Sequence, residues 1–183
     1  MHELAKLNDI IMKNIINSIK NSLENKNWHS ALILSLIVPD ICGKLEGSGN
    51  SSKRYLAWFN KYLGKKYQNF LSGDDCYALR CSYLHEGSGS IEKQRAKDVL
   101  DHFVFIPNGA HCNKFSNCYF GNSKYDGKEF LQLSVYQFCQ DIIEATQQWL
   151  IDVSKDQNIQ KNIAEMLEIY EEGFSIGNAL RIE

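Results

Sequence analysis

Apolar side chains recur at helical spacing from the beginning of the chain. In residues 3–24 an apolar side chain occupies every third or fourth position, and Asn, Lys and Asp fill many of the positions between. Residues three and four apart share one face of an α-helix, so this pattern predicts a helix that packs one face on the rest of the fold. The positions on that face are Leu4, Leu7, Ile11, Ile15, Ile19 and Leu23.

Residues 28–45 are apolar on nearly every side, which indicates a helix at the centre of a bundle. Pro39 lies inside this segment, where it removes a backbone hydrogen bond and predicts a kink. Asp40 follows it directly. An acid at this place is either an orienting group for a functional site or an exposed residue at a helix end, and the sequence leaves both interpretations open.

A basic and aromatic segment follows the central helix. Residues 47–73 contain no acidic side chain, and residues 52–64 have the spacing of a third helix. Lys61, Lys65 and Lys66 are candidate RNA-binding residues, because ammonium groups bind phosphates and nearby aromatic rings stack on bases. Alternatively, the aromatic residues form the core-facing stripe of this helix and the lysines are solvated opposite them. The aromatic residues concerned are Tyr55, Trp58, Phe59 and Tyr62.

Residues 91–133 contain strand-like patterns. Residues 91–100 favour a short polar helix or a turn. Aromatic and β-branched residues at 103–106 and 129–133 favour two strands. We expect these strands to form a small β-hairpin within an insert at about 103–133.

The remainder of the chain returns to helical spacing. Ser134 is a good N-cap for a long helix that ends near residue 153. A C-terminal helix is expected at 156–172, with one apolar face made by Ile159, Ile163, Met166, Leu167 and Tyr170. The predicted fold is therefore a single all-α domain spanning residues 1–183, an up-down bundle of five to six helices with the hairpin insert.

Composition is that of one soluble globular domain. The chain has 183 residues, of which 44% are hydrophobic, and its net charge is only -2. No global positive charge draws it to nucleic acid, so such binding must depend on a local patch. The longest apolar run, residues 31–38, is too short to span a bilayer, and the amino terminus is unlike a signal peptide. We expect a cytoplasmic protein without a membrane partner.

The six cysteines are scattered along the chain, which favours reduced thiols over a disulfide framework. His111, Cys112 and Cys118 suggest zinc ligands at first sight. However, five residues separate the two cysteines, and no second close pair exists. We expect no metal and no other cofactor.

The segment at 74–87 combines strong helix signals with side chains suited to catalysis. Asp74 and Asp75 open it and Gly87 closes it, as expected for a capped helix. Arg80 and His85 lie about 140° apart around such a helix and flank one face. Imidazole exchanges protons near neutral pH and guanidinium binds phosphate, so the pair suits phosphoryl chemistry. Tyr77, Cys81 and Leu84 lie between them on that face, the first two as possible supporting residues.

The spacing Arg80-Cys-Ser-Tyr-Leu-His85, late in a helix of a small helical domain, resembles the motif of HEPN domains. Many members of that family are metal-independent endoribonucleases of toxin–antitoxin and defence systems. The resemblance implies RNA as the substrate, His85 as general acid or base, and Arg80 as the group that stabilises the phosphate. It also implies a homodimer that places two motifs together, and an antitoxin or nucleotidyltransferase as a further partner.

Other interpretations of the motif remain open. The family often has Asn, Asp or His after the arginine, and Cys81 at that place would mark a catalytically inactive HEPN-like module that binds a nucleotide or a protein. A third possibility is a purely structural helical domain. In that case His85 is a capping or core histidine, and Arg80 is a partner in a surface ion pair.

Overall fold

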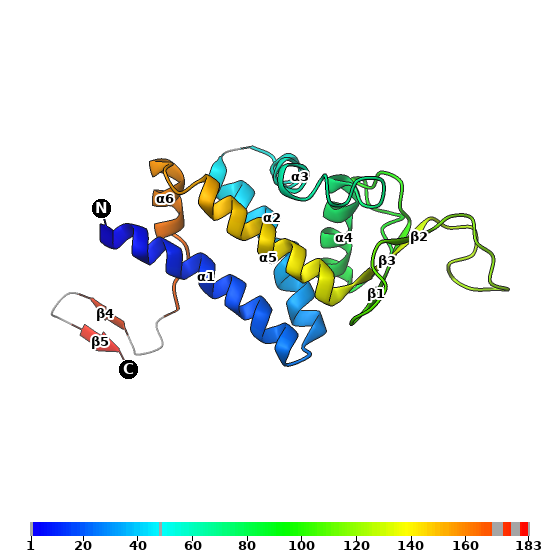
Figure 1. The fold of residues 1–183 in the computed structure, drawn as a ribbon, viewed down its shortest axis with the longest axis horizontal. Coiled ribbons are helices and arrows are strands. Elements are labelled where there is room, and N and C mark those ends of the chain that lie inside the picture. The colour runs from blue at the N-terminus through cyan, green and yellow to red at the C-terminus, as the bar shows by residue number, and fades with distance from the viewer. Residues whose placement is uncertain (1, 48, 170–173, 177–179, 183) are drawn as a thin grey trace.

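The computed structural model of the chain describes residues 2–47, 49–169, 174–176 and 180–182 (Figure 1). Within these ranges the side chains are described from residue 11 to residue 169. The helices are α1 (His2–Glu24), α2 (Trp28–Glu46), α3 (Ser51–Tyr62), α4 (Gly73–Glu86), α5 (Val135–Asp152) and α6 (Gln157–Ala164). The strands are β1 (His102–Ile106), β2 (Asn113–Phe115), β3 (Phe130–Ser134), β4 (Phe174–Ile176) and β5 (Leu180–Ile182).

The predicted all-α class is wrong. Helices make up 54% of the structure and strands 9%, so the fold is mixed α/β with a helical majority. Strands β1, β3 and β2 form a three-stranded mixed sheet in that order, and β4 and β5 form a separate antiparallel pair. In Figure 1 the three-stranded sheet lies at the opposite end of the molecule from α6.

The insert at about 103–133 is not the expected β-hairpin. β1 and β3 pair in parallel, from His102 opposite Phe130 to Ile106 opposite Ser134. The returning antiparallel partner of β3 is β2, in which Phe115 lies opposite Phe130. Parallel strands cannot be joined by a tight turn, so the chain between them has to cross over, and it does so through β2 and the following loop.

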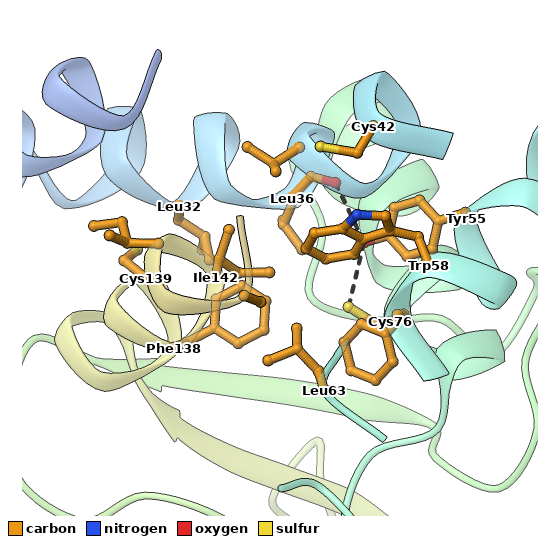
Figure 2. Close-up of a cluster of buried hydrophobic side chains, with 14 of the residues drawn as sticks. Leu32, Leu36, Cys42, Tyr55, Trp58, Leu63, Cys76, Phe138, Cys139 and Ile142 are labelled. Carbon is orange, nitrogen blue, oxygen red and sulfur yellow. Dashed lines mark hydrogen bonds between the residues drawn. The ribbon is translucent and has the colours of Figure 1, made fainter. Parts of the chain in front are cut away.

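Helix α2 occupies the centre of the helical part, as its apolar sequence predicts, and continues through Pro39 to Glu46. It packs against α1, α3, α4, α5 and α6. Figure 2 shows Leu32 and Leu36 of α2 meeting side chains of α3, α4 and α5. Among the described helices α2 alone has the length and apolar composition of a membrane span, but half of that segment is buried by the protein, as in the core helix of a soluble domain.

The apolar face of α1 is rotated slightly from the predicted one. Ile11, Ile19 and Leu23 are buried as expected, and so are Met12 and Ile16, whereas Ile15 is only half-buried. Leu4 and Leu7 fall where side chains are not described.

The C-terminal helix is shorter than predicted. Asp156 accepts hydrogen bonds from the Asn158 and Ile159 backbone N–H groups and starts α6, which ends at Ala164 rather than at residue 172. Leu167 is 89% exposed, so there is no packing surface to hold a further turn. Tyr170 of the predicted apolar face lies outside the described residues.

Candidate functional site

Helix α4 has well-defined ends, which confirms the capped helix predicted around the motif. Ser72 is its N-cap, and the Ser72 hydroxyl accepts a hydrogen bond from the Asp75 backbone N–H at 3.1 Å. Gly87 ends the helix in the left-handed conformation, with φ of 63°. This conformation favours glycine, because a Cβ atom is disfavoured there. The motif residues are therefore fixed to a rigid element.

Arg80 is held by Asp40 of α2. The Arg80 Nε and Asp40 Oδ2 atoms are 2.8 Å apart, although the N–H is poorly aligned for a hydrogen bond, so the contact is an ion pair. The Ser51 hydroxyl donates to the other carboxylate oxygen at 2.7 Å. The Asp40 side chain is only 16% exposed. Asp40 is therefore not an exposed residue at a helix end, and its carboxylate lies where it can orient Arg80.

Tyr77 and Cys81 extend this cluster along α4, and both are half-buried. The Tyr77 ring packs edge-on against Tyr55, with the ring centres 5.2 Å apart. Burial raises the pKa of the Tyr77 hydroxyl, and the Asp40 carboxylate adds to that increase, while Ser51 opposes it. Tyr77 therefore keeps its proton at neutral pH, and its hydroxyl is hydrogen-bonded within this cluster to Ser51 and Cys81.

His85 is exposed in the last turn of α4 and makes no hydrogen bond or ion pair with another described residue. It is therefore not a core histidine. Arg80 and His85 are separated by about 7.5 Å along the helix axis, at 1.5 Å per residue. The structure places them on one helix, about 140° apart around its axis, and does not bring them into contact. A single copy of the chain offers one free imidazole on this helix.

The three candidate RNA-binding lysines have different surroundings. Lys66 forms ion pairs with Asp141 at 2.5 Å and with Glu144 at 3.1 Å, so carboxylates already neutralise its charge. The Lys61 ammonium lies 4.8 Å from the centre of the Tyr62 ring, and Lys65 is exposed. Of the four aromatic residues in the alternative interpretation, Tyr55, Trp58 and Phe59 are fully buried as it predicts, whereas Tyr62 is half-buried. The Lys66 charge is thus already paired, and RNA binding by the three lysines stays a prediction.

A buried polar network around Asp141 of α5 was not predicted. The Tyr67 hydroxyl donates to Asp141 Oδ2 at 2.8 Å, and the Gln137 amide donates to Oδ1 at 2.7 Å. His111 Nε2 lies 3.2 Å from the Tyr67 hydroxyl, and Nδ1 accepts from the Ser134 N–H. The available sequence signal was an acid on the apolar face of a helix, the same signal that identified Asp40.

The His111 network also bears on the zinc ligands considered from sequence. Both ring nitrogens of His111 have protein partners, so neither nitrogen is free to bind a metal. Among the described residues, no three His, Cys, Asp or Glu side chains lie close enough together to hold a metal ion.

Comparison of the chain with models of known protein families, with curated proteins and with solved structures gave no match.

Proposed function

We propose that this chain is a metal-independent endoribonuclease of the HEPN type, with Arg80 and His85 as catalytic residues. The observation that carries the proposal is the contrast between two side chains of one capped helix. Arg80 is oriented by the Asp40 carboxylate, whereas His85 is open to solvent. An oriented cation and an accessible imidazole, about 7.5 Å apart along one helix, are groups that cleavage of a phosphodiester by an attacking hydroxyl can use.

Arg80 contributes charge and position. A guanidinium carries five N–H donors in a planar fork, and the Asp40 contact uses the Nε edge. The Nη groups remain for the scissile phosphate, where they stabilise the negative charge that builds on its oxygens in the transition state. Asp40 acts through Arg80 and is a positioning residue.

His85 contributes proton transfer. Its imidazole takes the proton from a ribose 2′-hydroxyl, and the resulting oxygen attacks the adjacent phosphorus while the bond to the 5′-oxygen breaks. The products are a 2′,3′-cyclic phosphate and a 5′-hydroxyl that has gained a proton. Because one motif has one imidazole, a second copy of His85 across a homodimer supplies that proton. The proposal includes a cytoplasmic toxin or defence role, with an antitoxin or nucleotidyltransferase as the controlling partner.

The test is cleavage of mixed RNAs by purified protein in the presence of a metal chelator. Wild-type protein should yield fragments with cyclic phosphate ends, and His85→Ala should lower the rate by about 100-fold or more, the usual contribution of a general acid or base. His2→Ala, a histidine change in α1 outside the motif, is the matched control and should keep full activity. Fragments that His85→Ala produces at the wild-type rate would refute the proposal. An inactive but folded wild-type protein would favour the nucleotide- or protein-binding module.

A further inference from the structure

A cavity of about 450 Å³ lies where the first turn of α2, the second half of α4 and strand β1 meet. Its volume falls in the range of about 300–1,000 Å³ that is typical of small-molecule sites. Trp28 and Leu32 of α2, Leu79 of α4 and Phe105 of β1 give it largely apolar walls. This cavity is a second candidate site on α4, and it lies on a different face from His85. Tyr83 in the cavity wall points about 160° away from His85 around the helix axis.

The cavity exists because β1 is an edge strand that is only partly covered. The Phe103 N–H donates to the Gly89 carbonyl at 2.8 Å, which fastens the loop after α4 to the beginning of β1. A Cβ atom at Gly89 would lie 2.7 Å from the Phe103 carbonyl oxygen, so this close approach requires glycine. Beyond that contact the edge of β1 faces the cavity, where Val104 and Ile106 line it.

Two pairs of an imidazole and a phenol bring polar groups to these apolar walls. The His29 Nδ1 atom is hydrogen-bonded to the Tyr83 hydroxyl, which joins α2 to α4. The His102 and Tyr125 rings meet edge to face, with their centres 5.0 Å apart. Burial lowers the pKa of His102, and the Lys124 and Lys128 ammonium groups add to this effect. His102 is therefore neutral at neutral pH and offers one donor and one acceptor.

The electrostatic character of the cavity favours an anion. Among the described residues that line it, none is Asp or Glu, while Lys124 is present. Helix α2 begins at the same wall, its N-cap Asn27 makes no side-chain capping hydrogen bond, and its first turn holds no acid. The partial positive charge at the start of α2 is therefore not neutralised by a side chain.

We infer that this cavity binds a planar aromatic anion of mononucleotide size, with the ring against the aromatic side chains and the anionic group near Lys124. Tyr83 and Tyr125 line the cavity, and Lys124 lies 5.0 Å from the centre of the Tyr125 ring, so aromatic surface and positive charge occur together. Aromatic rings are surfaces on which bases stack. The neutral His102 then hydrogen-bonds the polar edge of that ring. This inference does not rest on the proposed ribonuclease activity.

The test is isothermal titration calorimetry with the four nucleoside 5′-monophosphates, the matching nucleosides and inorganic phosphate. We expect saturable binding of at least one monophosphate, about tenfold weaker binding of its nucleoside, and no measurable binding of phosphate alone. Lys124→Gln should weaken the monophosphate about tenfold and leave the nucleoside unchanged. Lys114→Gln is the control, because it removes the same charge from a lysine that is paired with Glu129 and does not line the cavity.

Tryptophan fluorescence locates the ligand. Trp28 lines the cavity and is half-buried, whereas Trp58 and Trp149 are fully buried elsewhere. Binding should change the emission of wild-type protein and of His85→Ala but not that of Trp28→Phe. The inference is overturned if no monophosphate binds saturably, if Lys114→Gln weakens binding as much as Lys124→Gln, or if His85→Ala abolishes binding. The last result would place the nucleotide at the motif and leave the ribonuclease proposal standing.

Discussion

Asp40 of α2 and Arg80 of α4 form an ion pair, with the carboxylate Oδ2 and the guanidinium Nε atoms 2.8 Å apart. The two residues come from different helices, and each is mostly buried, with side chains 16% and 23% exposed. The pair therefore fixes both the direction of the arginine and the position of the motif helix against the core helix. It connects the stability of the fold to the proposed chemistry.

Replacing Asp40 by Asn should test that connection. The variant leaves the Arg80 charge without its partner, and we expect a loss of about 1–2 kcal/mol in the free energy of unfolding, between the values for exposed and buried pairs. RNA cleavage should fall as well, because Arg80 is no longer oriented. Urea denaturation measures the first effect and the chelator assay the second.

Lys161→Gln is the control, because it breaks the exposed pair with Glu165 and should cost less than about 0.5 kcal/mol in the free energy of unfolding. An equal cost for both variants would contradict the structural role of Asp40.

Asp75 should matter more for stability than any residue of the motif itself. Its carboxylate is 2% exposed and accepts hydrogen bonds from the backbone N–H groups of Asp98, Val99 and Leu100, at 2.7, 3.2 and 3.2 Å. Asp75→Ala removes these acceptors, and we expect a loss of about 3 kcal/mol, measured by thermal or urea unfolding. Asp98→Ala is the control, because it leaves the backbone N–H of that residue in place and should change stability little.

The stability of the protein should decrease as the pH falls below about 6.5. Burial lowers the pKa of His111 from its ordinary value of 6.5, and Lys66 adds to this effect while Asp141 opposes it. Because the pKa is lower in the folded state, the unfolded chain binds the proton more readily than the folded protein does. The part of the free energy of unfolding that comes from this difference is therefore present above pH 6.5, and it is lost as the pH falls through the folded-state pKa. His102 has a pKa lowered in the same direction.

Urea unfolding at several pH values measures this dependence. In His111→Asn, the Asn oxygen can still accept the Ser134 N–H hydrogen bond, but the titrating group is gone. The variant should therefore lose less stability than the wild type between neutral and mildly acidic pH. Equal pH dependence in the two proteins would show that His111 does not contribute to it.

The helices of this fold could be predicted from sequence because their signals are local. Ser134 was expected to cap the helix that follows, and its hydroxyl accepts from the Gln137 N–H at 3.3 Å. The sheet was harder, because the direction of pairing between β1 and β3 depends on contacts far apart in sequence. The strand Asn113–Phe115 also has too few residues to show an alternating pattern.

The candidate site could be predicted only in part for the same physical reason. The position of His85 in the last turn of a capped helix follows from local signals, but its exposure does not, since the sequence left a core histidine open. The partner of Arg80 does not, since nothing in the spacing of either residue joins it to Asp40. An isolated acid in an apolar helix identified Asp40, and the same criterion applied to α5 would have identified Asp141.

The homodimer remains a prediction, and Leu84 is the residue that tests it. Leu84 lies between Arg80 and His85 on the motif face and is half-buried, as are Tyr77 and Cys81 beside it. This partly apolar surface suits a two-fold interface. Cleavage also requires a proton donor for the leaving oxygen, and one motif provides only one exposed imidazole. Two copies related by a two-fold axis near α4 would supply both.

Sedimentation velocity at micromolar concentration should therefore show a dimer for the wild type and a monomer for Leu84→Glu, because a carboxylate in an apolar interface is not solvated there. The monomer should retain its helical circular dichroism and lose RNA cleavage. Ile151→Glu makes the same change on α5, where the side chain is already 67% exposed, and should remain dimeric and active. A monomeric wild type, or a Leu84→Glu protein that stays dimeric, would remove the composite site, and His85 would then need a proton donor from within its own chain.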